Sequence, residues 1–135
     1  MAQDETTFLD LGTNLNDVPD LTTAVGGEYE LRIVDLGITT TEKGKFLIPR
    51  LEIVGQPLSK EITAPLRIPD ESMDEKERNR RLRGLKAFYK AFGVNEAGPV
   101  VFNDQLGKTG WATLDESEDA KYGKQNNVRQ WLAKR

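Results

Sequence analysis

Apolar and polar side chains alternate with a period of two from residue 28 onward. The first apolar positions in this pattern are Tyr29, Leu31 and Ile33. They predict a strand with one buried face and one solvent-exposed face. The apolar positions then move by one residue, to Val34, Leu36 and Ile38. Such a change of phase predicts a β-bulge or strong coiling, which a small barrel needs in its first strand.

Four further strands are predicted, at residues 46–54, 61–68, 106–114 and 128–132. Residues 39–45 predict a hairpin loop between the first two strands, and residues 115–127 predict a polar loop between the last two. Pro49 and Pro65 have no backbone N–H for a ladder hydrogen bond. We therefore expect each proline at a sheet edge or a bulge.

One helix is predicted between the third and fourth strands. Ser72 and Glu75 have the spacing of a capping box, and Gly93 is placed to end the helix. An apolar stripe follows spacings of three and four, through Leu82, Leu85, Tyr89 and Phe92, with Phe88 beside it. Basic residues gather on the other side, namely Lys76, Arg80, Arg83, Lys86 and Lys90. Three interpretations of this basic ridge are open. It is a face exposed only to solvent, a continuation of a surface that binds nucleic acid, or a surface that contacts a partner protein.

The net charge of −3 conceals a division along the chain. Residues 1–31 contain seven acids and no base, whereas all 19 Lys and Arg lie in residues 32–135 together with 15 acids. The N-terminal part therefore sums to −7 and the remainder to +4. This division predicts a body that binds polyanions, next to an acidic segment that itself resembles a polyanion. The alternative explanation is that the acidic segment is a solubilising tail.

We expect two parts in the chain. Residues 1–26 form an acidic N-terminal arm, and residues 27–135 form one folded domain. The apolar residues of the arm follow no clean period, which predicts a mobile or loosely docked segment.

The 135 residues include no cysteine and no histidine. Disulfides, thiolate nucleophiles and Cys-ligated zinc are thereby excluded, and the usual general base and commonest transition-metal ligand are missing. We therefore expect a protein that is not an enzyme and holds no metal or cofactor. The chain begins without the basic and apolar regions of a signal peptide, and no apolar run approaches the roughly 20 residues of a membrane span. We expect a cytoplasmic protein with no membrane partner.

The order strand, strand, strand, helix, strand, strand is that of an OB-fold. We predict a mainly β protein with one helix, a five-stranded OB-fold barrel that follows the flexible acidic arm. Other α+β folds share this order, so the positions of aromatic and basic residues carry additional weight. OB-folds bind single strands on the face of strands two and three and with the loops that join strands one to two and four to five.

The candidate binding residues fall in or near those places. Basic side chains contact phosphates, and aromatic rings stack on bases. The predicted DNA-binding residues are Arg32, Lys43, Lys45, Phe46, Arg50, Arg67, Trp111, Lys121, Tyr122, Lys124, Arg129 and Trp131. For each of the aromatic residues in this set, a place in the core is the alternative to base stacking.

Two other patterns have ordinary explanations. Gly107-Lys108-Thr109 is similar to the end of a Walker A loop, but Phe102 stands where the upstream glycine is required. Nucleotide hydrolysis is therefore not expected. The four acids in residues 115–119 offer oxygen ligands to a hard cation but lack the spacing of an EF-hand loop, which favours a solvated loop.

Several stretches resemble the single-stranded-DNA-binding proteins of tailed bacteriophages, an OB-fold family often found with phage replication and recombination genes. The stretches are residues 27–33, 43–47, 51–55, 79–82, 91–93, 106–108 and 122–128. The resemblance implies binding without sequence specificity, which protects single strands during replication or recombination in the host cytoplasm. Phage or host replication and recombination proteins are then expected partners. The resemblance implies that the loop contacts are Lys43, Lys45, Phe46, Tyr122 and Lys124.

The acidic segment is at an unusual place for such a protein. Many single-strand binders end in an acidic tail that recruits partner enzymes, whereas this sequence ends in Lys134-Arg135 and has its acids at the other end. The arm is then a competitor for the DNA groove, a recruitment segment or a solubilising tail. The alternative function is a protein-interaction module or virion component on the same barrel. A homo-oligomer is compatible with both functions.

Overall fold

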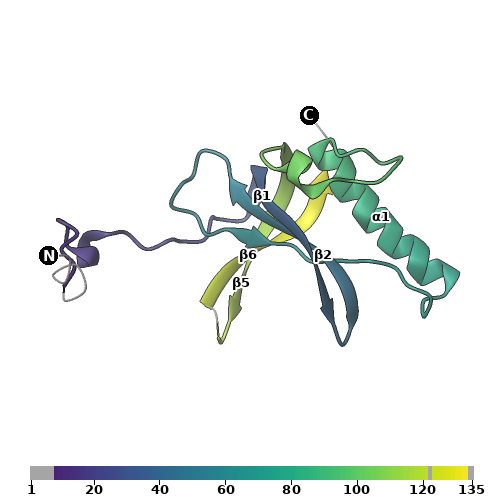
Figure 1. Cartoon of the computed structure of the whole chain (residues 1–135), viewed down its shortest axis with the longest axis horizontal. Helices are drawn as coiled ribbons and strands as arrows, with labels where there is room; N and C mark the ends of the chain where they lie inside the picture. Colours follow the sequence, from purple (N-terminus) through teal and green to yellow (C-terminus); the bar gives the residue numbers. More distant parts are fainter. Residues whose placement is uncertain (1–7, 122, 134–135) are drawn as a thin grey trace, which may run out of the picture.

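The computed structural model describes residues 8–121 and 123–133, in which one antiparallel sheet lies beside a long helix (Figure 1). The strands are β1 (Gly27–Thr41), β2 (Gly44–Ile53), β3 (Ile62–Thr63), β4 (Leu66–Arg67), β5 (Thr109–Asp119) and β6 (Gly123–Leu132), and the helix is α1 (Glu75–Phe92). The strand order is β3-β2-β1-β5-β6, and β4 also pairs with β2. The prediction of a mainly β protein with one α-helix is confirmed for the described residues.

The long strand β1 bends at a bulge. Its register with β2 shifts between Ile33 and Asp35. Leu31 and Ile33 before the shift and Leu36 after it are all buried. The extra residue therefore keeps Leu36 on the core face with Leu31 and Ile33 while the strand coils, and the predicted bulge is confirmed. Ile38, farther along the strand, is 55% exposed.

The third predicted strand is divided into β3 and β4. These strands pair with β2 on either side of Ile48 and Pro49, where no ladder forms. The break in the outer strand holds Ala64 and Pro65. Because neither proline can donate a ladder hydrogen bond, the pairing is interrupted on both strands at the same level. The sheet therefore has six strands among the described residues, where five were predicted.

Both predicted loops are mainly strand in the structure. β1 and β2 continue to Thr41 and Gly44, and β5 and β6 continue to Asp119 and Gly123. The expected loops at residues 39–45 and 115–127 were wrong, because a hairpin with two solvent-exposed faces shows no apolar alternation. The two hairpins project to the same side of the molecule, which is downward in Figure 1.

The start of α1 differs from the prediction, and its end agrees. The Asp74 side chain caps the helix by accepting a hydrogen bond from the Glu77 backbone N–H at 2.8 Å. The predicted capping box that begins at Ser72 is therefore wrong. Gly93 ends the helix in the left-handed conformation (φ 69°), as predicted.

The last turns of α1 enter the core. Phe88, Ala91 and Phe92 are buried, whereas Leu82, predicted on the apolar stripe, is 44% exposed. The helix approaches β5 so closely at Gly110 that a Cβ atom there would overlap the Ala91 carbonyl oxygen. A glycine at this position permits the approach. In the described part of the chain, no helix has the length and apolar character to cross a membrane.

The sheet is open between β3 and β6, and the N-terminal arm crosses the opening. β3 and β6 lie close together but share no ladder in the part of the chain that is described. The Thr22 N–H donates to the Leu58 carbonyl at 2.9 Å, and the Thr22 carbonyl accepts from the Lys60 N–H at 2.8 Å. The Ala24 N–H donates to Asn126 Oδ1 at 2.8 Å, and the Ala24 carbonyl accepts from Asn126 Nδ2 at 2.9 Å. Residues 22–24 therefore fasten the segment before β3 to β6.

Two further hydrogen bonds support this junction. Lys60 Nζ donates directly to the Lys124 carbonyl at 2.9 Å, and Asn126 Nδ2 also donates to the Asp115 carbonyl at 3.2 Å. The preceding residues of the arm extend away from the sheet, toward the left in Figure 1. The arm thus has a docked part at residues 22–24 and a projecting part at residues 8–21, which includes the short 3-10 helix η2 (Leu15–Asp17).

We predict that Asn126→Ala destabilises the fold by roughly 1–3 kcal/mol, because it leaves the backbone polar groups of the buried residue Ala24 without partners. Urea unfolding measures this loss, and hydrogen exchange should show faster exchange of the Ala24 N–H. The control is Asn127→Ala, which removes an exposed hydrogen bond to Ser117 and should change stability by no more than about 0.5 kcal/mol. Equal effects of the two substitutions would contradict the role given to Asn126.

Candidate nucleic-acid interface

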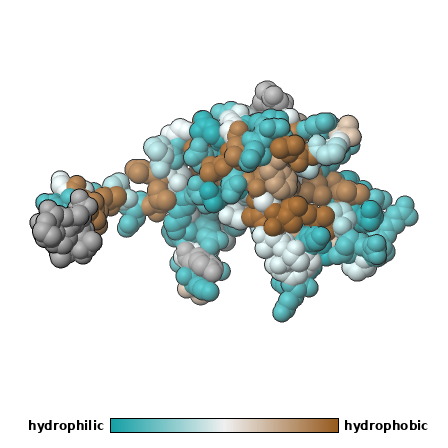
Figure 2. Space-filling model, viewed as in Figure 1, coloured by the Kyte–Doolittle hydropathy of each residue, from teal (hydrophilic) through white to brown (hydrophobic). Residues whose placement is uncertain are grey.

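The outer face of the β1–β2 hairpin carries a hollow with an apolar floor. Core residues alternate along β2, so Phe46 and Ile48 point to the opposite, outer face. Together with Pro65 from the β3–β4 break, they line a hollow of about 540 Å³. Thr39, Thr41, Glu42 and Lys43 complete its lining. In Figure 2, brown apolar side chains gather over the upper part of this hairpin, and the tip is pale to teal.

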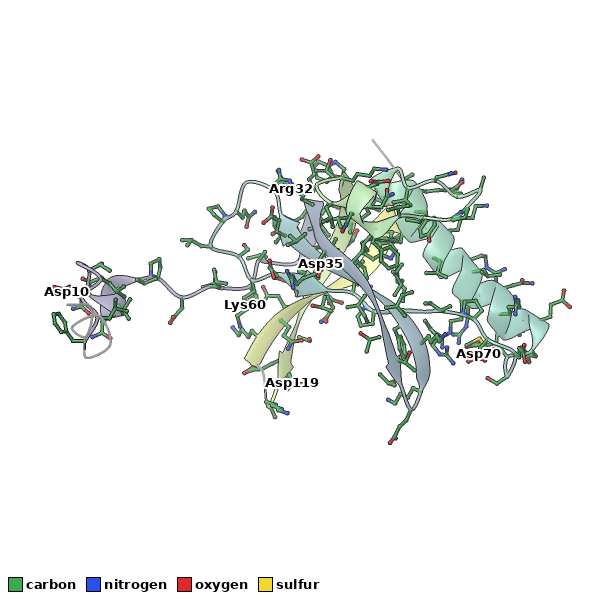
Figure 3. All side chains as sticks on the ribbon, in the orientation of Figure 1. Asp10, Arg32, Asp35, Lys60, Asp70 and Asp119 are labelled. Carbon is green, nitrogen blue, oxygen red and sulfur yellow. The ribbon has the colours of Figure 1, made fainter. Side chains whose placement is uncertain are left out.

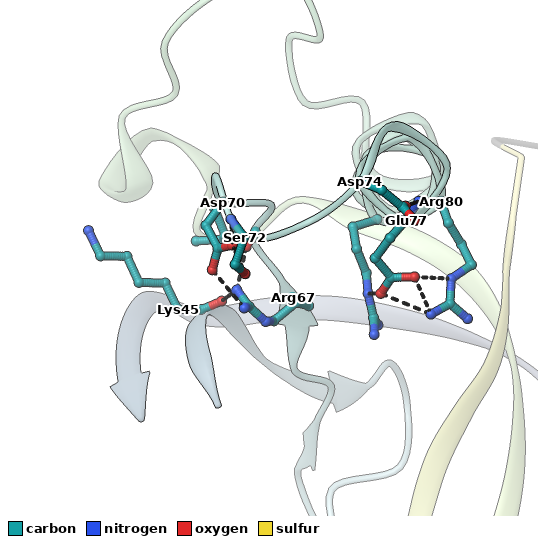
Figure 4. Close-up of polar contacts among 9 residues, drawn as sticks. Lys45, Arg67, Asp70, Ser72, Asp74, Glu77 and Arg80 are labelled. Atoms are coloured by element: carbon teal, nitrogen blue, oxygen red, sulfur yellow. Dashed lines mark hydrogen bonds and ion pairs between the residues drawn. The ribbon is translucent and has the colours of Figure 1, made fainter. Parts of the chain in front are cut away.

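Arg67 on β4 holds the Phe46 ring in place. Its guanidinium carbon lies 5.7 Å from the ring centroid, within the range of a cation–π contact. The guanidinium donates to the Ile68 carbonyl at 2.6 Å and to Asp70 at 2.8 Å, and a longer bond of 3.4 Å reaches the Lys45 carbonyl (Figure 4). Because the Arg67 side chain is only 11% exposed and pairs with a carboxylate, its geometry favours positioning of Phe46 over contact with a phosphate.

The other two predicted arginines on this face are in ion pairs. Arg32 pairs across the strands with Glu52 at 2.8 Å. Arg50 pairs with Glu61 at 3.1 Å and lies 4.0 Å from Asp35. These side chains are about half exposed, and exposed ion pairs contribute little stability. A phosphate can therefore replace a carboxylate at Arg32 or Arg50 at small cost.

The predicted lysines lie on the two projecting hairpins. Lys43 and Lys45 are exposed at the β1–β2 tip, and neither pairs with a carboxylate in the described part of the chain. Lys121 and Lys124 flank the turn of the β5–β6 hairpin, whose tip is marked by Asp119 in Figure 3. Tyr122 lies outside the described residues. Arg129 is exposed on β6.

The two tryptophans have different surroundings. The Trp131 ring packs edge-on against Phe88 and Phe92, with centroids 5.0 and 5.8 Å apart, which favours the core alternative for Trp131. Trp111 alternates with the buried residues Gly110 and Ala112 on β5, so it lies on the outer face and is half-buried. Trp111 is thus the tryptophan whose position is compatible with base stacking.

Ile48 and Pro65 were not predicted to belong to the site. Ile48 pairs with Gly37 on β1, where a Cβ atom would have no neighbour within 4 Å. Because Gly37 has no side chain, nothing from β1 covers Ile48 at this point of the hollow. Strand alternation places Ile48 on the same face as Phe46, so the place of Ile48 in the site could have been predicted from the sequence pattern. Nothing local signals Pro65, because it reaches the hollow only through the break between β3 and β4.

A second hollow of about 140 Å³ continues from Pro65 to α1. Its lining includes Arg80, Arg81 and Gly84. Both guanidiniums bond to the Glu77 carboxylate, at 2.7 and 2.8 Å, so the three groups together carry one positive charge (Figure 4). The hydrogen bonds from Arg80 and Arg81 lower the pKa of Glu77. The apolar floor therefore leads toward a positively charged part of the helix.

Asp70 anchors the turn that holds Arg67. The hydrogen bonds from Ser72 and then from Arg67 lower the pKa of Asp70 from 3.8 to about 2. A carboxyl group whose pKa falls on folding stabilises the fold above its unfolded-state pKa. This stabilisation is lost as the pH falls through the folded-state value.

We predict that Asp70→Asn destabilises the protein at neutral pH, and that the difference from the wild type shrinks as the pH falls from about 4 to about 2. Urea unfolding at a series of pH values measures this change. Glu71→Gln is the control, because the neighbouring Glu71 is exposed and has no ion pair in the described part of the chain. A difference for Asp70→Asn that stays constant with pH would contradict the assignment.

No model of a known protein family matches the chain, and no curated protein matches it. The chemistry of the described faces is therefore the basis on which a function can be proposed.

Proposed function

We propose that the protein binds single-stranded DNA without sequence preference, with no catalytic activity. The observation that carries this proposal is the hollow on the β1–β2 face, where an aromatic ring and apolar neighbours lie beside lysines that pair with no carboxylate among the described residues. Phe46, Ile48 and Pro65 offer a surface for unstacked bases, and Lys43 lines the same hollow. Apolar stacking surfaces bordered by cations are typical of proteins that bind single strands irrespective of sequence.

The Arg67 contact makes Phe46 a suitable stacking platform. A ring held in one orientation loses little conformational freedom when a base stacks on it. The 5.7 Å cation–π contact and the ion pair of Arg67 with Asp70 supply that restraint from one side. The strand of DNA then contacts Lys43 and Lys45 through its phosphates, and the exposed arginines Arg32 and Arg50 can exchange carboxylates for phosphates.

The connectivity of the sheet supports the OB-fold interpretation. β1 lies between β2 and β5, the helix follows the β3–β4 segment, and β6 approaches β3 again. If β3 and β4 are counted as one interrupted strand, this connectivity is compatible with a five-stranded barrel of the OB type. In such a barrel, the β1–β2 and β5–β6 hairpins border the binding face. The role we propose is protection of single strands during phage replication or recombination, in the cytoplasm of the host.

Titration of a fluorescent oligo-dT at low and high salt tests this proposal. We expect binding at low salt that weakens as salt rises, because lysines that contact phosphates release bound counterions. No binding at low salt, or binding independent of salt, would contradict the proposal.

Substitutions on the hairpin separate stacking from charge. Phe46→Ala should weaken binding by roughly 1–3 kcal/mol with little change in salt dependence, whereas Phe46→Tyr should retain affinity. Lys43→Ala should reduce the slope of log affinity against log salt by about 0.7 if Lys43 contacts one phosphate. Lys108→Ala is the control and should leave the slope unchanged, because Lys108 Nζ donates to the Gly93 carbonyl at the end of α1 and does not line the hollow. Unchanged affinity in Phe46→Ala with an intact fold would remove Phe46 from the site.

A protein-interaction module is the second candidate function. It is favoured by the ion pairs that neutralise Arg32, Arg50 and Arg67, and by the apolar side chains exposed along the arm. A pull-down that yields a stoichiometric protein partner, from a protein with no affinity for oligo-dT, would favour this function over DNA binding.

A further inference from the structure

We propose that the N-terminal arm of one copy of the chain docks on α1 of a second copy. Residues 8–21 carry apolar side chains that are 49% to 79% exposed, namely Phe8, Leu9, Leu11, Leu15, Val18 and Leu21. They follow one another along a segment that extends away from the sheet, visible as brown side chains on the left in Figure 2. Such a concentration of exposed apolar surface on one short segment is typical of a docking segment.

One side of α1 offers a matching groove. Leu82, Leu85 and Tyr89 line it at spacings of three and four, and the segment after the helix supplies Glu96 and Gly98. The groove has a volume of about 560 Å³. Leu82 is 44% exposed, and Leu85 and Tyr89 pack against the core but are only half-buried, so an apolar strip of the helix remains partly exposed in the described structure.

The charges of the two surfaces are complementary. Residues 8–21 include Asp10, Asp17 and Asp20 and no basic residue. Arg78 and Lys86 lie one helical turn before and after Leu82, and neither pairs with a carboxylate in the described residues. The groove lining also contains one acid, Glu96, so Arg78, Lys86 and Glu96 together carry one positive charge. An acidic segment with apolar side chains therefore suits this groove in both respects.

The geometry of the arm selects a second copy as the occupant. Hydrogen bonds at Thr22 and Ala24 fix the base of the arm at the opening between β3 and β6. From there the arm leads away from its own helix, with Asp10 at the far left in Figure 3 and α1 at the right. A contact between the arm of one copy and the helix of another is heterologous, so it links copies into a ring, a chain or an exchanged dimer.

Sedimentation of the full chain without DNA tests the proposal, and we expect the average mass to rise with protein concentration. Leu82→Asp should raise the dissociation constant at least about tenfold, because it places a charge in the apolar contact. Leu106→Asp is the matched control, since Leu106 is 43% exposed and does not line the groove. The arm variant Leu11→Asp/Leu15→Asp should also weaken association, and Thr13→Asp should have a much smaller effect.

Mixing the two defective variants gives the sharpest result. A copy with a defective groove and a copy with a defective arm retain one complete contact between them, so a 1:1 complex should form on mixing. A wild-type protein that stays monomeric, or an oligomer that Leu82→Asp leaves intact, would overturn the proposal. Because DNA is absent throughout, this outcome is independent of whether the β1–β2 face binds nucleic acid.

Discussion

One buried side-chain amide connects the N-terminal segment to the last strand of the sheet. The Asn126 side chain on β6 accepts a hydrogen bond from the Ala24 N–H and donates one to the Ala24 carbonyl. Two residues earlier, both the N–H and the carbonyl of Thr22 form hydrogen bonds with the segment before β3. A satisfied buried polar network of this kind fixes geometry strongly, since each unpaired group would be costly. The two ends of the open sheet are thereby held together. The mutual placement of the β1–β2 and β5–β6 hairpins depends on that closure.

Much of the regular structure could be predicted because its causes are local. The change of apolar phase after Ile33 indicated the bulge, and Gly93 indicated the end of the helix. The start of the helix was missed because Ser72 and Asp74 both suit a cap, and in the structure Ser72 donates to the Asp70 carboxylate while Asp74 caps the helix. The junction at Asn126 could not be predicted, because its partner lies 102 residues away. From the sequence, residues 115–127 predict a loop, because a largely exposed hairpin needs no apolar alternation.

The candidate site was predicted in part. Phe46 and Lys43 line the hollow, as a loop-and-strand site requires. The ion pairs of Arg32 and Arg50 depend on cross-strand register, which shifts at the bulge and so cannot be counted from the sequence. Trp131 and Trp111 both lie on strands. Trp131 faces the core and Trp111 faces outward, and the sequence does not give the face on which each side chain lies. Pro65 enters the site through the break in the ladder opposite Pro49, a consequence of two prolines meeting in space.

The protein therefore combines two surfaces with different chemistry. The β1–β2 face has an aromatic floor and cations, and the groove on α1 has an apolar floor suited to an acidic segment. The proposed function requires nucleic acid to occupy the first of these surfaces. Backbone chemical shifts recorded while an unlabelled oligo-dT is added to the isotope-labelled protein test it most directly. We expect shifts concentrated at residues 39–48 and 65–67, with the α1 groove unaffected. Shifts confined to α1, or none at all at low salt, would contradict it.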